Sequence, residues 1–283
     1  MKNTRIFKIA ILVFTICCAL FLLSSCSENQ DNEDIPSTTE NTAPLTVTVT
    51  FPEGSNAVQF AMKLEENGVC SASEFLACVN STEYLPLLPV SITNAEEKAF
   101  LLEGYLFPDT YEFYYNTSAD AVIRKILENT ALKITDAHKA RAAELGYTMD
   151  EIISLASIIQ EEAGNPDEMP YVSSVIHNRL DSPSYPYIEC DVAIKYLENF
   201  VKPYFTQEEY DSICWNYNIV RKRQGLPAGA ITNTGIAAIE AALYPADTDY
   251  FFFVTDNDGN YYYAHTYSKH RENCRLAGIQ GNY

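Results

Sequence analysis

The first folded segment of the chain shows two different spacings of hydrophobic residues. Residues 45–51 (LTVTVTF) alternate apolar and polar positions and are rich in β-branched side chains, which predicts a strand that Pro52 ends. Residues 56–66 and 71–79 then place apolar side chains three and four positions apart, which predicts two short helices. Together they predict a small β-α-α unit, and the Pro-rich residues 84–90 suit a hinge after it.

The remainder of the chain has mainly helical spacing. Predicted helices cover residues 119–129, 135–145, 149–162, 167–180 and 236–243. Residues 250–255 predict a buried strand and 261–264 its return strand, because the Asn-Asp-Gly-Asn sequence between them is typical of a hairpin turn. The pattern therefore predicts an α+β fold, with a β-α-α subdomain (45–90) before a mainly helical domain (91–283) that contains a small β-sheet.

Residues 1–25 have a pattern of their own. Three basic residues precede an unbroken apolar run of 15 residues that ends in Leu-Ser-Ser-Cys, as in a secretory signal. The run is short for a membrane-spanning helix, which needs about 20 residues. Leu-Ser-Ser-Cys resembles the bacterial lipobox, which implies a lipoprotein signal peptide cleaved before Cys26 and lipidation of that thiol. An uncleaved single-span anchor and simple secretion stay open. All three place the body outside the cytoplasm, and the first places it on the outer face of the cytoplasmic membrane.

Charge narrows the classes of partner. The chain has 19 Lys and Arg against 38 Asp and Glu, a net charge of -19, so its surface would repel a phosphate backbone and nucleic acid is not an expected partner. Attachment to a membrane must then come from the N-terminal segment. Residues 26–44 are polar and acidic with almost no apolar side chains, which predicts a disordered tether.

Cysteine and histidine spacing gives no indication of a metal or redox site. The eight cysteines form no CxxC, and the four histidines show no HExxH or Cys/His ligand spacing, so no metal and no cofactor are expected. Five cysteines follow the tether, and an odd number cannot all pair within one molecule.

One carboxylate stands out by its helical phase. In the helix that ends at Glu162, three apolar side chains share one face: Ile152, Leu155 and Ile159. Glu162 falls within about 20° of that face, whereas Glu161 lies about 120° away. The helix dipole and partial desolvation at this end favour a protonated carboxyl, which a general acid requires. A glutamate that simply extends into water is the alternative. Gly164, just beyond the helix, is a usual stop.

A second acid, Glu103, lies among aromatic residues. Aromatic faces with a few acids suit carbohydrate rings, although such a run is more often part of a hydrophobic core.

Five short motifs occur in order along the chain. They are LEGYLFPDTY (102–111), LASIIQEE (155–162), VIHNRL (175–180), GLPAGAI (225–231) and TYxxH (266–270). They closely resemble the motifs of the endolytic murein transglycosylase (YceG-like) family. Residues 51–55 and the elements after them resemble the LysM-like subdomain that precedes the catalytic part of that family.

The resemblance implies an endolytic lytic transglycosylase that cleaves MurNAc-GlcNAc β-1,4 bonds within peptidoglycan glycan strands and leaves 1,6-anhydro-MurNAc ends. Glu162 matches the family's catalytic glutamate. Six further positions are expected to bind substrate: Glu103, Asp109, Asn178, Glu189, Asp191 and Asn218. The expected partners are glycan strands, the membrane through the lipid anchor, and peptidoglycan synthases, whose involvement stays open.

The sequence also departs from the family pattern. Glu189 stands where Gln is usual, Val192 replaces a proline, and Asn218 lies in a segment that only loosely resembles the family's YNT. Residues 261–263, three tyrosines, occupy a place where His is often found. A non-catalytic peptidoglycan-binding lipoprotein that scaffolds wall synthesis is the chief alternative. A solute-capture lipoprotein would need a two-lobed α/β repeat that the sequence does not show.

Overall fold

The structure is a computed structural model that describes residues 45–185, 187–220 and 222–279. The predicted signal peptide (1–25), the lipidation candidate Cys26 and the predicted tether (26–44) lie outside the described residues. Within the described ranges, no helix is both long enough and apolar enough to cross a membrane.

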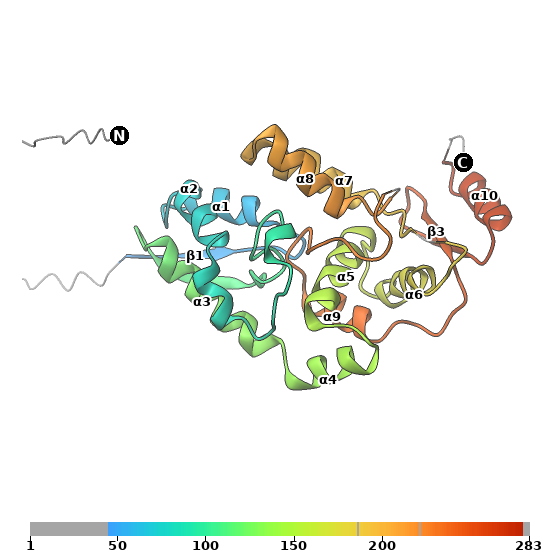
Figure 1. Cartoon of the computed structure of the whole chain (residues 1–283), viewed down its shortest axis with the longest axis horizontal. Helices are drawn as coiled ribbons and strands as arrows, with labels where there is room; N and C mark the ends of the chain where they lie inside the picture. The colour runs from blue at the N-terminus through green and yellow to red at the C-terminus, as the bar shows by residue number, and fades with distance from the viewer. Residues whose placement is uncertain (1–44, 186, 221, 280–283) are drawn as a thin grey trace, which may run out of the picture. The chain divides into compact units, whose positions relative to one another are not determined.

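The first sheet joins two strands that lie far apart in the sequence. Strand β1 (Thr46–Thr50) pairs antiparallel with β2 (Thr110–Tyr114), with Thr46 opposite Tyr114 and Thr50 opposite Thr110. Helices α1 (Ala57–Glu66), α2 (Ala72–Val79) and α3 (Ala119–Lys133) lie around this sheet (Figure 1). The β-α-α order was predicted, but β2 was not. The sheet joins strands from both sides of residue 90, where the sequence predicted a boundary between two domains. That boundary and the LysM-like character of the first subdomain stay predictions.

A second group of helices surrounds α5 (Met149–Glu162), which has the predicted bounds. It contacts α4 (Asp136–Glu144), α6 (Met169–Leu180) and α9 (Ile236–Leu243). Nine of its 14 residues are buried, because these neighbours and the segment before α9 cover it on several sides. α5 is therefore enclosed along most of its length (Figure 1), and its last three residues, up to the half-buried Glu162, lie at the edge of the core.

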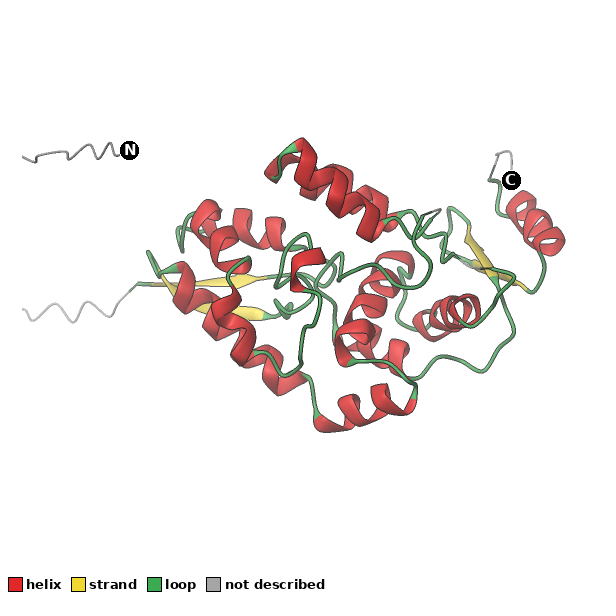
Figure 2. Ribbon diagram, in the orientation of Figure 1, coloured by secondary structure: helices red, strands yellow, loops and turns green. Residues whose placement is uncertain are grey.

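The C-terminal part combines short helices with the predicted hairpin. Strands β3 (Phe252–Thr255) and β4 (Tyr261–Ala264) pair antiparallel, and Figure 2 shows them as a small sheet apart from the first. The hairpin and the α+β class are thus confirmed. The following elements were not predicted: α7 (Val192–Tyr196), a short π-helix (Leu197–Val201), α8 (Gln207–Tyr217), α10 (Tyr267–Leu276), and 3-10 helices at Thr82–Leu87, Ala95–Glu97 and Lys202–Tyr204.

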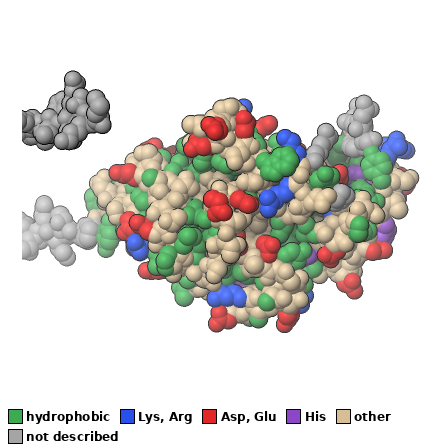
Figure 3. Space-filling view, viewed as in Figure 1, with side chains coloured by type: hydrophobic (Ala, Val, Ile, Leu, Met, Phe, Trp, Pro, Cys, Tyr) green, Lys and Arg blue, Asp and Glu red, His purple; other side chains and the backbone are tan. Residues whose placement is uncertain are grey.

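Acidic side chains are spread over the visible face of the molecule (Figure 3). On the face drawn in Figure 3, acidic side chains occur in several separate groups, and basic side chains are scattered among them rather than gathered in one patch. This distribution agrees with the excess of acid in the sequence.

Candidate active site

Glu162, the last residue of α5, lies in the wall of a cavity of ≈ 640 Å³. Four other parts of the chain complete the wall: α6, residues 188–195, strand β3 with the residue before it, and α10 with Ile279 beyond its end. The lining side chains are Glu162, Val175, Ile176, Arg179, Ile188, Glu189, Cys190, Asp191, Lys195, Phe251, Phe252, Phe253, Val254, Thr255, Tyr267, His270 and Ile279. Three of the motifs recognised in the sequence therefore meet at one place.

The environment of Glu162 favours its protonated form. Burial raises the pKa of this carboxyl above its usual range, and the neighbouring charges of Asp191 and Glu161 raise it further. A hydrogen bond from the Cys190 thiol and the charge of Lys195 act in the opposite direction, and burial is the largest effect. A carboxyl in this state can donate a proton at a pH where an exposed glutamate has already lost it.

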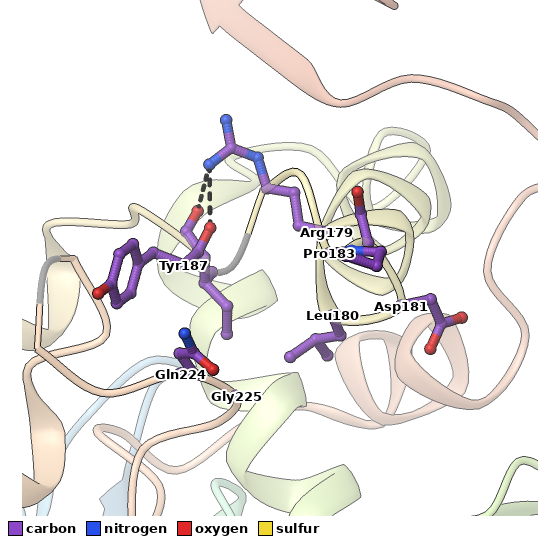
Figure 4. Close-up of a pocket in the computed structure, with 9 residues that line it drawn as sticks. Arg179, Leu180, Asp181, Pro183, Tyr187, Gln224 and Gly225 are labelled. Carbon is purple, nitrogen blue, oxygen red and sulfur yellow. Dashed lines mark hydrogen bonds between the residues drawn. The ribbon is translucent and has the colours of Figure 1, made fainter.

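Arg179 shapes the cavity from inside α6. Its buried guanidinium donates to the carbonyl oxygens of Phe251 (2.7 Å), Ile188 (3.0 Å) and Tyr187 (3.3 Å), and it pairs with Glu189 at 2.7 Å. Figure 4 shows the bonds to the 187–188 loop, where Arg179 also borders a neighbouring cavity of ≈ 440 Å³. One arginine thus holds both the 187–188 loop and the residue before β3, although its place in the sequence did not indicate a site residue.

The hairpin supplies an aromatic wall and a connection to α5. Phe252 stacks on His270, with ring centroids 5.1 Å apart, and both line the cavity. On β4, the hydroxyl of Tyr261 bonds to the backbone at the end of α5, and that of Tyr263 donates to Glu168 at 2.8 Å. The hairpin therefore contacts both the cavity and the loop that follows Glu162.

Polar side chains along another face of α5 hold the segment 227–235, which contains most of the GLPxGxI-like motif. Ser157 Oγ accepts from the N–H of Ile231 at 3.1 Å, and Gln160 Oε1 accepts from the N–H of Gly235 at 3.0 Å. This motif contributes no residue to the cavity wall and acts on the site through α5.

Glu161 faces a different cavity from its neighbour Glu162. It lines a smaller one of ≈ 190 Å³ together with residues of the β1–α1 loop and α7. Burial raises the pKa of Glu161 as well. Lys195 borders both cavities. The two adjacent carboxylates therefore diverge, as their helical phase predicted.

Glu103, expected to contact substrate, is placed in the core instead. Its side chain is 1% exposed and accepts hydrogen bonds from the N–H of Ala57 (3.0 Å), the amide of Asn233 (2.7 Å) and the hydroxyl of Tyr196 (3.2 Å). Burial raises its pKa to about 8. Because its hydrogen bonds join α1, α7 and the segment before α9, this carboxyl group braces the fold rather than facing the cavity.

The other expected substrate contacts divide into two groups. Glu189 and Asp191 line the cavity. Asp109, Asn178 and Asn218 do not. Asp109 accepts from Asn129 and pairs with Lys133 in the first part of the fold. Asn178 donates to the carbonyls of Thr248 and Tyr250, both at 2.9 Å. Asn218 ends α8, and its carbonyl accepts from the two amides of residues 222 and 223.

Several cavity residues were absent from the sequence-based selection: Cys190, Lys195, Phe252 and Tyr267. Cys190 and Lys195 lie within four residues of Asp191, so their proximity could have indicated them. Phe252 belongs to a run of aromatic residues whose inward face is decided by strand pairing, and no local signal identifies it.

Among the residues that the structure describes, no group of three or more His, Cys, Asp or Glu side chains is arranged to hold a metal ion. The chemistry that the described side chains offer is proton transfer by Glu162 within a partly apolar cavity.

Comparison with known proteins gives matches over most of the chain. The endolytic murein transglycosylase of Bacillus subtilis strain 168 is 28% identical over 234 residues, which cover 79% of this chain and 63% of that protein. The protein of the same name from Streptococcus pneumoniae strain D39 is 26% identical over 259 residues, covering 83% of this chain and 45% of that protein. The chain thus spans less than two thirds of the length of these relatives.

A solved structure and a family profile agree with these matches. The crystal structure of a yceG-like protein from Listeria monocytogenes has a TM-score of 0.65 to this chain at 25% identity, covering 82% of this chain and 76% of that one. Residues 25–276 match the profile of the YceG-like family. Because this match covers most of its length, the chain belongs to the YceG-like family.

Proposed function

We propose that this chain is an endolytic murein transglycosylase, which cleaves the β-1,4 bond between N-acetylmuramic acid and N-acetylglucosamine inside peptidoglycan glycan strands. The observation that carries the proposal is Glu162: a carboxyl with a raised pKa in the wall of a cavity, at the position that matches the family's catalytic glutamate. The names of the Bacillus and Streptococcus relatives support the same reaction class.

In the proposed mechanism, Glu162 acts twice. Its protonated carboxyl donates to the glycosidic oxygen as the bond to C1 breaks and positive charge develops on the sugar ring. The resulting carboxylate then accepts the proton of the muramic C6 hydroxyl, whose oxygen bonds to C1. The product ends in a 1,6-anhydro ring, and Glu162 recovers its proton. Since attack is intramolecular, no water nucleophile and no second catalytic carboxylate are required.

The cavity suits this chemistry in two respects. Phe252 and Tyr267 present aromatic surface of the kind that packs against sugar rings, while Glu189 and Asp191 offer carboxylate oxygens to hydroxyl and amide groups. We therefore retain Glu189 and Asp191 as proposed substrate contacts. Asp109, Asn178 and Asn218 would affect the substrate only through the segments that they hold.

The test is product analysis with a pair of adjacent variants. Purified protein should release anhydro-muropeptides from peptidoglycan, as detected by mass spectrometry. Glu162→Gln should lower this release at least about a thousandfold, since it removes the acid and the base together. Glu161→Gln changes the neighbouring carboxylate, which lines the other cavity, and should keep most of the activity, because burial and not the charge of Glu161 is the main cause of the raised pKa of Glu162.

Three other results would contradict the proposal, each in a different way. Activity that survives in Glu162→Gln would remove Glu162 from the mechanism, and products with reducing ends would indicate a hydrolase. Binding to peptidoglycan without any product from the unmodified protein would favour the non-catalytic scaffold.

The N-terminal segment and the first module belong to the proposal as well. Lipidation of Cys26 would hold the body at the outer face of the cytoplasmic membrane. A LysM-like role for the β1–α1–α2 unit would mean that this unit also binds glycan. The first is tested by Cys26→Ser, which should move the protein from the membrane fraction to the soluble fraction. Equal membrane recovery for both proteins would favour a spanning anchor.

A further inference from the structure

The backbone at the end of α5 is held by a side chain from the hairpin. The hydroxyl of Tyr261 accepts a hydrogen bond from the N–H of Gly164 at 2.9 Å and donates one to the carbonyl oxygen of Glu162 at 3.2 Å. The last carbonyls of a helix have no partner within the helix, so they need one from elsewhere. At this helix the partner is a phenol that lies 97 to 99 residues further along the chain.

This arrangement replaces the ending that the sequence suggested. Gly164 was expected to stop α5; a glycine that ends a helix commonly does so with positive φ, but Gly164 is not among the glycines with positive φ. The chain instead leaves the helix at Ala163 in an extended conformation (φ −108°, ψ 102°), and only the N–H of Ala163 bonds back, to Ile159. Tyr261 therefore supplies a cap that the local backbone does not provide.

Tyr261 is itself held firmly. It is the first residue of β4 and pairs with Thr255 of β3. Its ring lies beside those of Phe253 and Tyr263, with centroids 6.5 and 6.2 Å away. Because Tyr263 bonds to Glu168, the same strand fixes both ends of the loop between α5 and α6. The hairpin thus lines the cavity through β3 and holds the acid-bearing helix end through β4.

We propose that Tyr261 is a positioning residue for Glu162: its hydroxyl fixes the end of α5 so that the Glu162 carboxyl stays in the cavity wall. The inference rests on the proposed function only for its effect on catalysis, because its effect on Glu162 itself can be measured separately. Displacement of a catalytic group by about 1 Å is enough to lower a rate strongly, so two backbone hydrogen bonds at this point matter.

The test replaces single hydroxyl groups on the same strand. Tyr261→Phe removes both hydrogen bonds and keeps the ring. Tyr262→Phe is the matched control, because the Tyr262 hydroxyl bonds to Asp256 at the hairpin turn and the residue does not line the cavity. We expect Tyr261→Phe to lower kcat for anhydro-product release about tenfold with KM within about twofold, and Tyr262→Phe to change neither by more than about twofold.

Two pH measurements separate positioning from a general loss of stability. A carboxyl released from the cavity wall gains water and its pKa falls, so the decline of kcat on the alkaline side should begin at lower pH in Tyr261→Phe. NMR titration of the Glu162 carboxyl in labelled protein should show the same downward shift, and Tyr262→Phe should show none.

The possible results are distinct. If the unmodified protein forms no product, the proposed function fails, and the NMR titration still decides the role of Tyr261. An unchanged Glu162 titration in folded Tyr261→Phe would overturn the positioning role, as would equal effects of the two variants on kcat.

Discussion

Gly104 occupies a place where no other residue fits without strain. Its φ is +89°, and a Cβ added there would lie 2.6 Å from the Cβ of Ala230 and 2.7 Å from Cγ2 of Ile153. Its N–H donates to Asn233 at 2.8 Å, so the backbone cannot move away without losing that bond. Gly104→Ala therefore combines an unfavourable backbone conformation with a clash against α5.

The cost can be estimated from these two effects. A left-handed conformation costs a non-glycine residue about 1–2 kcal/mol, and overpacking of a well-filled core costs about 1–3 kcal/mol. Gly104→Ala should lower the free energy of unfolding by about 3 kcal/mol, the middle of the summed range less the small gain from a stiffer unfolded chain. With a urea m-value of about 2–3 kcal/mol/M, the midpoint of urea unfolding should fall by more than about 1 M.

Gly146 provides the control. Its φ is +83°, but a Cβ there would have no heavy atom within 4 Å. Gly146→Ala should therefore cost only about 1 kcal/mol and move the midpoint by less than about 0.5 M. Equal midpoint shifts for the two variants would refute the reasoning, because the close contacts with Ala230 and Ile153 would then contribute nothing.

Two further predictions concern buried ionisable groups. The folded-state pKa of Glu103, about 8, lies above its usual value of 4.5, so the stability of the protein should fall as pH rises between these values, at about 1.4 kcal/mol per pH unit for this group. Glu103→Gln should flatten that fall in urea midpoints measured from pH 5 to pH 8, and an unchanged slope would contradict it. Arg179→Lys should lower the Tm by about 5–10 °C in calorimetry, because a lysine cannot serve the carbonyls of Ile188 and Phe251 together. An unchanged Tm would show that these carbonyls find other donors.

The sequence predicted those elements whose hydrophobic spacing or turn residues lie within a short stretch of the chain. The apolar stripe of α5 and the turn residues of the β3–β4 hairpin each determine their element within about 15 residues. Strand β2 cannot be recognised from its own residues alone. Its partner β1 lies some 60 residues away, and only the pairing with β1 makes β2 a strand. Helices α8 and α10 are rich in polar residues, so neither presents an apolar stripe long enough to predict it.

The motifs can be recognised from the sequence, but only the folded structure determines which side chain of each motif lines the cavity. In the segment VIHNRL, the neighbours Asn178 and Arg179 point to different partners: Asn178 bonds to backbone outside the cavity and Arg179 lines it. Local helical phase separates such neighbours, but it cannot say which face meets a cavity that strands and helices from other parts of the chain complete.

Glu103 and Glu162 explain why a raised pKa alone does not identify a catalytic acid. Burial raises the pKa of both carboxyls, and both belong to motifs of the family. Glu103, however, is only 1% exposed and has its oxygens bonded to donors from α1, α7 and Asn233. Glu162 has a weak thiol donor beside it and open space in front. A proton on Glu162 can therefore be delivered to a bound molecule, whereas a proton on Glu103 can change only the stability of the fold.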